Sequence, residues 1–538
     1  MTSLTDTNED YAVWLPSISN FYNNIITRYH HQGDDYFPPE RIPVGLEHGL
    51  AGCNFLKEDD SYFQYKWGLY SIGHAQRDVT KTDKRDMIIQ QRDRSKTFIL
   101  GDSGGYQIVT GVIKCDWNNF KSDDSLRHQV LNWLEHTADY SMILDVPTLA
   151  TLPQYSAKSG IKDFAQCLDY TKFNADFFVK NRKFETKYLN VMQGMNEQES
   201  RAWYDAVKHY PFEGWAFSGA CKSNKIDILL RRLIQMRDDK LLERGERDLV
   251  HILGVGKLEL AVVYTAIKRA LREHVNPDME FTFDAASPFI GASKGEIYAE
   301  SIYKSDSFRL QTDRFINDKS LKGSTVRLPY RSPIADRLTM GDMCYQRQVS
   351  KTSWDSLTYM LMQGHNTYSH IESIQRANRF ADSTMPLIDT DHNLWSQVSG
   401  KGKARQIDDH IPVEVVYMIN FIEKLFKSEN PMTMINEAES LFATFSRQKS
   451  VKNSDVLEIN MAKKIRLIDD TVETVGDAAI APLTESPKGD TIGSAFSKDD
   501  VEKLMKIAEA IDWKLWELLK FTQKFEDVML QSATSSQD

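Results

Sequence analysis

The sequence predicts an α/β fold, a (β/α)8 TIM barrel, followed by a basic segment and an all-helical C-terminal region. From about residue 40 to residue 285, short apolar runs alternate with amphipathic helical stretches. Most of these runs lack a strict alternation of apolar and polar residues, which is typical of strands that are buried on both faces. A strand followed by a helix, repeated up to eight times, is the pattern of this barrel, and a doubly wound open sheet is the alternative.

The predicted strands are short runs rich in β-branched, aromatic and leucine residues. In chain order they are Ile42–Leu46, Gly68–Ile72, Thr97–Leu100, Ser141–Leu144, Tyr188–Met192, Trp215–Phe217, Leu249–Leu253 and Phe281–Phe283. Between these runs apolar residues recur at helical spacing, which predicts a helix in the gaps. The clearest examples are Val130 with Leu134, Leu229 with Leu233, and Val263 with Ile267.

The chain divides into three predicted regions. Residues 1–40 form an N-terminal extension, residues 41–385 form the barrel, and residues 400–538 form a helical C-terminal region. Within the second region, residues 301–351 contain ten Lys or Arg residues and five Asp residues, which gives a local net charge of +5. Further helices are expected at residues 353–380, 413–426 and 499–530, and the Thr, Gly, Pro and Ser content of residues 475–496 is typical of a flexible stretch.

Composition limits the cellular setting and the partners only loosely. The five cysteines (Cys53, Cys115, Cys167, Cys221 and Cys344) are scattered and odd in number, which favours reduced thiols in a cytoplasm. The polar first eleven residues predict no signal peptide, and no apolar stretch approaches the length of a membrane span. The net charge of -10 neither supports nor excludes nucleic-acid binding, because binding depends on where the basic residues lie.

Six consecutive predicted strands end in a polar residue or a glycine. In a parallel barrel the active site lies at these carboxyl ends, so we expect the residues to converge on one pocket. They are Asp102, Asp145, Gln193, Ser218–Gly219, Gly254–Val255–Gly256 and Asp284. Taken singly, each is also compatible with a structural role, since Asp caps helices and Gly forms tight turns in any such loop.

These residues lie in a set of motifs that resembles a known enzyme family. The segment Gly101–Gln107 reads Gly-Asp-Ser-Gly-Gly-Tyr-Gln and is similar to the Asp-Ser-Gly-Gly-Phe/Tyr-Gln motif of tRNA-guanine transglycosylases. Other motifs follow in the family's order and at similar spacing: Asp145 in Ile-Leu-Asp-Val-Pro, Val191–Gly194, Trp215–Gly219, Leu253–Gly256, Phe283-Asp284 and His365-Asn366. The resemblance covers roughly residues 95–380, and the ordered set is more specific than the first motif alone.

The resemblance implies base exchange through a covalent intermediate. Asp284 would attack C1′ of the sugar and expel guanine, and Asp102 would act as the general acid and base on the departing or arriving base. The expected base-binding residues are Ser103, Tyr106, Asp145, Gln193, Gly219 and Leu253. Among them Asp145 and Gln193 would hydrogen-bond the guanine edge with the Gly219 amide, while Tyr106 and Leu253 would enclose the ring. The target nucleotide must leave its stack for this chemistry.

The family's zinc site is the clearest departure from the resemblance. The family has a Cys-x-Cys-x-x-Cys run before the His of His-Asn, whereas this region offers only Cys344 together with His365. A structural zinc needs four ligands, so we expect no zinc of the family type, no other cofactor, and a hydrogen-bonding role for His365. This departure looks more like the DpdA-type transglycosylases of phages and bacteria, which insert 7-deazaguanine derivatives (preQ0-like or preQ1-like bases) into DNA.

The expected partners are therefore a nucleic acid, with DNA favoured over tRNA, and a free 7-deazaguanine base or guanine. The enzyme would work in the cytoplasm, of a bacterial host cell if the chain is phage-encoded. Five arginines of the basic segment are expected to contact phosphates: Arg309, Arg314, Arg327, Arg331 and Arg337. The alternative for this segment is a solvated face without a ligand.

Three rival functions remain open at this point. The first is the tRNA enzyme itself, acting on an anticodon guanine. The second is a non-catalytic partner subunit that keeps the barrel and binds nucleic acid, which the presence of Asp102, Asp145 and Asp284 disfavours. The third is an unrelated barrel glycosidase with two carboxylates, which the glycine-rich motif around Asp102 disfavours.

Overall fold

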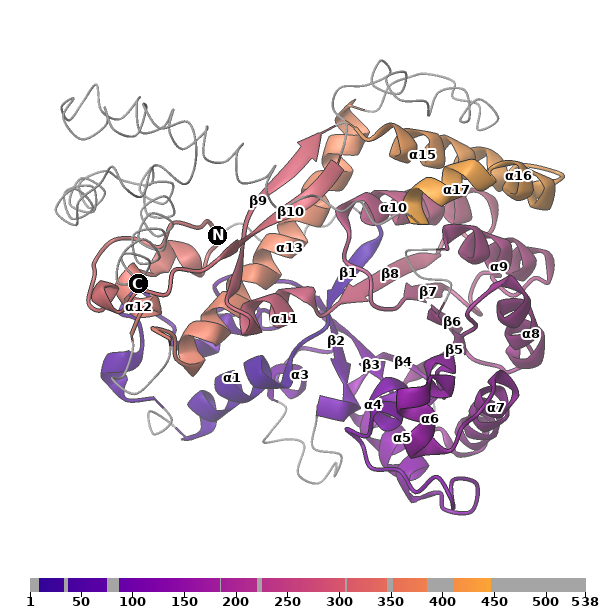
Figure 1. Cartoon of the computed structure of the whole chain (residues 1–538), viewed down its shortest axis with the longest axis horizontal. Helices are drawn as coiled ribbons and strands as arrows, with labels where there is room; N and C mark the ends of the chain where they lie inside the picture. The colour runs from indigo at the N-terminus through magenta and orange to yellow at the C-terminus, as the bar shows by residue number, and fades with distance from the viewer. Residues whose placement is uncertain are drawn as a thin grey trace, which may run out of the picture.

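The core of the molecule is a (β/α)8 barrel of eight parallel strands, as predicted (Figure 1). The structure is a computed structural model, and it describes residues 9–32, 37–74, 87–183, 185–219, 225–304, 307–345, 352–384 and 411–446. The barrel strands are β1 (Val13–Pro16), β2 (Trp67–Ser71), β3 (Phe98–Asp102), β4 (Tyr140–Met142), β5 (Lys187–Met192), β6 (Gly214–Phe217), β7 (Leu249–Ile252) and β8 (Glu280–Ala285).

The strands pair in the order β1-β8-β7-β6-β5-β4-β3-β2, and the pairings are parallel. The two ends of this order meet, because Ser17 after β1 forms a parallel bridge with Leu69 of β2. Next to this bridge the Ile18 amide donates to the Leu69 carbonyl at 2.9 Å. The carboxyl ends of all eight strands therefore surround one rim, which excludes the open sheet that the sequence left as an alternative.

The first strand is not where the sequence analysis predicted it. The predicted strand Ile42–Leu46 is instead a pair of turns, closed by bonds from the Ile42 amide to the Pro39 carbonyl and from the Leu46 amide to the Pro43 carbonyl. The true first strand, Val13–Pro16, is fully buried but only four residues long, too short to show a periodic pattern. The barrel thus begins within the segment that was assigned to an N-terminal extension.

Helices surround the strands on the outside of the barrel (Figure 1). The helices up to the last barrel strand are α1 (Asn20–Gln32), α3 (Met87–Gln90), α4 (Gly105–Thr110), α5 (Ser125–Thr137), α6 (Pro153–Ser159), α7 (Phe164–Asn181), α8 (Glu197–Val207), α9 (Ile226–Asp238) and α10 (Leu258–His274). Helix α10 buries residues on most of its surface, because it packs against two later helices as well as against the barrel. None of the described helices combines the length and hydrophobicity that a membrane crossing requires.

The segment after β8 builds a second layer beside the carboxyl-end rim. Helix α11 (Ser287–Ser293) leads into an antiparallel hairpin of β9 (Glu296–Lys304) and β10 (Ser307–Arg314). After a short α12 (Met340–Met343), the long helix α13 (Ser356–Thr384) packs against α11 and β9, which Figure 1 shows beside the barrel. The basic segment therefore begins as a hairpin that is joined to the rim through α11.

Three short helices follow in the described part of the C-terminal region: α15 (Val413–Leu425), α16 (Pro431–Glu437) and α17 (Glu439–Ser446). Helix α15 coincides with the helix predicted at residues 413–426, and it lies on α10, while α16 and α17 lie on α9. They extend the outer layer over α10 and α9, at the upper right of Figure 1. The predicted flexible stretch at 475–496 and the predicted helix at 499–530 lie outside the described residues.

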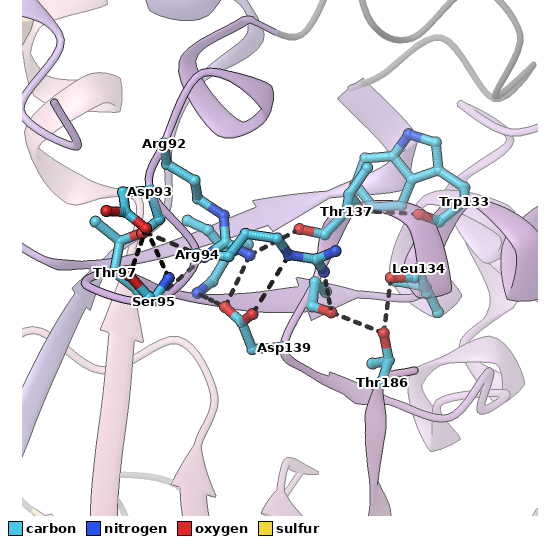
Figure 2. Close-up of polar contacts among 12 residues, drawn as sticks. Arg92, Asp93, Arg94, Ser95, Thr97, Trp133, Leu134, Thr137, Asp139 and Thr186 are labelled. Carbon is cyan, nitrogen blue, oxygen red and sulfur yellow. Dashed lines mark hydrogen bonds and ion pairs between the residues drawn. The ribbon is translucent and has the colours of Figure 1, made fainter. Parts of the chain in front are cut away.

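The amino-terminal end of the barrel, opposite to the rim, is held by an ion cluster around Asp139 (Figure 2). Asp139 follows α5, and its carboxylate lies 2.8 Å from Arg92 and 3.6 Å from Arg94. It also accepts a hydrogen bond from the Ile99 amide of β3 at 2.8 Å. The Arg92 side chain is 1% exposed, and its burial lowers the pKa of the guanidinium. One carboxylate thus joins β3, the start of β4 and the loop that precedes β3.

We expect Asp139→Ala to lower the free energy of unfolding by about 3 kcal/mol, because it leaves the buried Arg92 guanidinium without its counter-ion. Urea denaturation followed by circular dichroism measures this loss. The matched control is Asp169→Asn, which breaks the pair between Lys121 and Asp169, whose side chains are 45% and 60% exposed. That variant should cost less than about 1 kcal/mol. Equal losses in the two variants would contradict a structural role for the Asp139 cluster.

Candidate active site at the carboxyl ends of the strands

The loop after β3 is built around Asp102. Asp102 is the last residue of β3 and is partly exposed, and its Oδ1 accepts a hydrogen bond from the Gly104 amide at 3.0 Å. Ser103 is buried, and its hydroxyl donates to the Ile143 carbonyl beyond β4 at 2.9 Å. The Ser103 side chain therefore anchors the loop to the neighbouring strand. Its contact with a base stays a prediction.

The two glycines of this loop are required by close packing. Gly104 has a φ of 80°, and a Cβ on Gly105 would lie 2.5 Å from the Asp145 carbonyl oxygen and 2.6 Å from Asp145 Oδ1. Only glycine allows the start of α4 to approach Asp145 this closely. The motif around Asp102 therefore brings the loops after β3 and β4 together, which places Asp102 and Asp145 in adjacent parts of the rim.

Asp145, Gln193 and Gly219 form a continuous arc along three neighbouring strand ends. Asp145 is 8% exposed, and its Oδ2 accepts a hydrogen bond from Gln193 Nε2 at 2.7 Å. A Cβ on Gly219 would lie 3.2 Å from Gln193 Oε1, so the backbone of Gly219 passes directly beside this amide. A carboxylate, a side-chain amide and a backbone amide thus lie in one row, which suits the polar edge of a planar heterocycle.

Asp284 lies in β8 and is held by the loop after β7. Its Oδ1 accepts a hydrogen bond from the Gly254 amide at 2.7 Å, and its carbonyl accepts one from the Val255 amide at 2.5 Å. Asp284 is 6% exposed, and Oδ2 has no hydrogen-bond partner among the residues that the structure describes. The carboxylate is therefore fixed through one oxygen while the other is available for chemistry.

A histidine that the sequence analysis did not single out lies beside this carboxylate. His251 of β7 is fully buried, and its Nε2 lies 3.4 Å from Asp284 Oδ1. Its Nδ1 lies 2.9 Å from the Thr282 hydroxyl on β8. The available signal was strand alternation, because His251 stands two residues before Leu253 and therefore faces the barrel interior with it.

Several large apolar side chains are exposed in the segments that follow the barrel strands. Tyr106 is 54% exposed, and other exposed large apolar side chains follow β3, β4, β5 and β8: Val112, Leu152, Met195 and Ile290. Partial burial and a contact with Tyr155 raise the pKa of Tyr106, which keeps its hydroxyl neutral. Leu253, after β7, is partly exposed. Tyr106 and Leu253 are thus accessible at the rim, as stacking surfaces for a base would have to be.

No protein-family model matches this chain, and no curated protein is similar enough to match it. The functional interpretation therefore rests on the geometry of the rim and on the resemblance of its motifs.

The five arginines of the basic segment differ in how they are engaged. Arg309 and Arg314 lie on β10. Arg327 and Arg331 are exposed in the following loop, where Arg327 donates to the Asp336 carbonyl at 2.9 Å and Arg331 lies 3.4 Å from the Asp336 carboxylate. Arg337 instead forms a forked ion pair with Glu47, with distances of 2.9 to 3.1 Å. This hydrogen-bonded pairing raises the pKa of Arg337 and lowers that of Glu47. Arg337 therefore ties the basic segment to the loop before η3 (Leu50–Cys53).

Two cavities open on the basic segment. One of about 710 Å³ is lined by Arg41, Lys322 and Arg327 but also by Glu40 and Asp342. The other, of about 510 Å³, is lined by cations and carboxylates alike: Arg331, Arg376, Glu300 and Glu372. Because each mixes both signs of charge, neither cavity has the character of a dedicated anion site.

The residues at the position of the family's zinc site do not fit a metal. Cys344 is buried, its thiol lies 3.8 Å from the Ile316 carbonyl, and burial raises its pKa to about 11. His365 donates from Nε2 to the Tyr298 carbonyl at 2.8 Å and accepts at Nδ1 from Ser332 at 2.9 Å, a hydrogen-bonding role as predicted. Among the described residues, no three or more His, Cys, Asp or Glu side chains gather in a way that could hold a metal ion.

Proposed function

We propose that this chain is a transglycosylase that exchanges a guanine base in a nucleic acid through a covalent intermediate on Asp284. The observation that carries the proposal is the contrast between two acids on one rim. Asp284 is held through Oδ1 and leaves Oδ2 available, whereas Asp145 is bonded to Gln193 in a row of polar groups. The first arrangement suits a nucleophile, and the second suits recognition of a base.

The reaction has two halves that mirror each other. Asp284 Oδ2 attacks C1′, the bond from C1′ to guanine N9 breaks, and its electron pair leaves with the base. Asp102 supplies the proton that makes guanine a better leaving group. An incoming base then gives a proton back to Asp102 and attacks C1′, which breaks the ester bond and restores the Asp284 carboxylate. The negative charge of the Asp284 carboxylate stabilises the oxocarbenium-like transition state of both halves.

Base recognition is assigned to the arc of Asp145, Gln193 and Gly219. Asp145 accepts hydrogen bonds from the N1–H and amino group of guanine, and the other two read the carbonyl side. Tyr106 and Leu253 enclose the two faces of the ring. The exposed apolar side chains of the rim then contact the nucleotides next to the extruded one, which lose their stacking when it leaves the helix.

DNA is the favoured nucleic acid, and a 7-deazaguanine derivative or guanine is the incoming base. This choice rests on Cys344 and His365, which both make hydrogen bonds and do not provide the family's metal ligands. In the tRNA-guanine transglycosylases that the motifs resemble, the zinc region helps to hold tRNA. The alternative is the tRNA enzyme, with the same chemistry on an anticodon guanine.

The deciding experiment incubates the protein with radiolabelled guanine and either duplex DNA or unmodified tRNA, with Asp284→Ala as the control. We expect label to enter DNA with the native chain and not with the variant. Label that enters tRNA alone would replace DNA by tRNA. Label that enters neither, also with 7-deazaguanines as competitors or substrates, would favour the partner-subunit alternative over an enzyme.

The exposed arginines of the basic segment should contribute phosphate contacts. We expect the double variant Arg327→Ala/Arg331→Ala to weaken nucleic-acid binding across sequences and to reduce the salt dependence of log K by about 2, or about 1 for each cation lost. Fluorescence anisotropy at several salt concentrations measures this slope. Arg337→Ala is the control, because Arg337 is 24% exposed and held by Glu47 at 2.9 Å, whereas Arg331 is 71% exposed and contacts Asp336 at only 3.4 Å. This control should leave the slope unchanged.

A salt slope that is identical in the native chain and the double variant would remove these two arginines from the interface. The basic segment would then be a solvated face, and the hairpin arginines Arg309 and Arg314 would be the next pair to test.

A further inference from the structure

We propose that His251 is a positioning residue that holds Asp284 Oδ1 through a proton on Nε2 and so selects Oδ2 as the attacking oxygen. This inference rests on the proposed function, because it assigns a role within the same reaction. It concerns a side chain that touches neither the base nor the sugar and acts only through Asp284.

The placement of His251 follows from the register of β7 and β8. His251 is paired with Thr282, and Asp284 stands two residues further along β8, so all three side chains face the barrel interior. The imidazole bridges two layers of this interior. Its Nδ1 is 2.9 Å from Thr282 Oγ1 in the lower layer, and its Nε2 is 3.4 Å from Asp284 Oδ1 in the upper one.

The contacts of the imidazole determine where its proton must be. Nε2 is fully buried and, at its present distance from Asp284, has no hydrogen-bond partner among the residues that the structure describes. A bare Nε2 lone pair would face the lone pairs of a carboxylate at a buried position, which is unfavourable. A proton on Nε2 turns this repulsion into an attraction, so the Nε2–H form is the one that a charged Asp284 favours.

Thr282 is able to support this tautomer. Its hydroxyl is 3.5 Å from the Val250 carbonyl, at the limit of a hydrogen bond, but only 2.9 Å from His251 Nδ1. The hydroxyl hydrogen is therefore better placed on Nδ1, which then accepts and leaves the ring hydrogen on Nε2. Thr282, His251 and Asp284 form a chain in which each group orients the next.

The chemical consequence is a carboxylate with two different oxygens. Oδ1 faces the Gly254 amide at 2.7 Å and the His251 Nε2–H, which prevent rotation of the carboxylate and leave Oδ2 toward the sugar. When Oδ2 forms the ester, Oδ1 becomes the carbonyl oxygen, and it regains charge when the second base displaces the carboxylate. Donors at Oδ1 therefore stabilise the carboxylate as it leaves in the second half of the exchange. In the first half, where this charge disappears, they act by orienting Oδ2 toward C1′, and in neither half do they bind the free base.

The test compares two amide replacements of His251. Each keeps a polar group at the position of only one of the two ring nitrogens. A Gln side chain places its NH2 close to the position of Nε2, and an Asn side chain places its amide close to Nδ1. We expect His251→Gln to retain kcat within about tenfold and His251→Asn to lose about 100-fold, the usual cost of one donor at a developing charge. The KM for the free base should stay within about twofold in both, because neither variant touches the base arc.

The readouts are the rate of formation of the protein–nucleic acid adduct on denaturing gels and the steady-state exchange rate. Thr282→Val is a second variant that keeps the volume of the side chain and removes the partner of Nδ1. It should lower kcat by about tenfold, again without a change in KM. Urea midpoints and nucleic-acid affinity are measured for each variant, so that a loss of folding is recognised.

Equal rates in the Gln and Asn variants, or rates that follow the urea midpoints alone, would show that His251 only fills the core and would overturn the inference. If the native chain formed an adduct and His251→Asn formed it at the native rate, the inference would fail while the proposed function stood. If the native chain formed no adduct with duplex DNA, single-stranded DNA or tRNA, the proposed function would fail and this inference with it.

Discussion

Asp284→Ala should abolish base exchange, with a loss of at least about 10⁴-fold, while nucleic-acid binding stays close to that of the native chain. The size of the loss follows from the loss of the nucleophile, since removal of a covalent nucleophile leaves only the contribution of binding and electrostatics. Binding should persist because Asp284 is 6% exposed and the phosphate contacts are assigned to the arginines of the basic segment.

The adduct on denaturing gels and the incorporation of labelled base both measure this effect. Asp284→Asn is a closer control, because it keeps the volume and one acceptor for the Gly254 amide but cannot form the ester in the same way. It should be as inactive as the alanine variant. An adduct that persists in both variants would show that another residue is the nucleophile and would exclude the proposed mechanism.

Asp102→Asn is expected to lower the rate of guanine departure by about 10² to 10⁴-fold, the usual contribution of a general acid. The substitution should not disturb the fold, because an Asn oxygen can still accept the bond from the Gly104 amide that shapes the loop. The loss should appear in the first half of the exchange, as slower adduct formation in single-turnover experiments.

A substrate that needs no general acid provides the discriminating control for Asp102. A target nucleotide that carries 7-methylguanine already bears a positive charge on the base, so its departure requires no proton. Asp102→Asn should therefore form the adduct from this substrate at nearly the native rate. If the variant were equally slow on guanine and 7-methylguanine, Asp102 would act in binding or folding and not in proton transfer.

The sequence by itself determined the class of the fold and most of the strands. Runs such as Tyr188–Met192 and Leu249–Leu253 are apolar because parallel strands are covered on both faces, and the structure has β5 and β7 there. The placement of Asp102, Asp145, Gln193, Gly219 and Asp284 at one rim also follows from the chain order, since every barrel strand ends at the same side.

Other features depend on contacts between residues far apart in the chain, which no local pattern encodes. Val13–Pro16 is a strand only because its backbone pairs with β8, about 270 residues later, and the more strand-like Ile42–Leu46 lacks such a partner. Arg337 is likewise bound by Glu47, a residue 290 positions earlier, whereas other arginines of its segment are exposed.

The same reason separates what could and could not be predicted within the site. The acids were identified from their motifs. The different hydrogen-bond partners of Asp284 and Asp145 were not, because each carboxylate is contacted by a side chain from a neighbouring strand. Gln193 comes to Asp145 from β5, and His251 comes to Asp284 from β7. Local sequence thus determined which residues face the rim, whereas the lateral register of the strands decided which side chain lies beside which, and hence which carboxylate oxygen is left available to react.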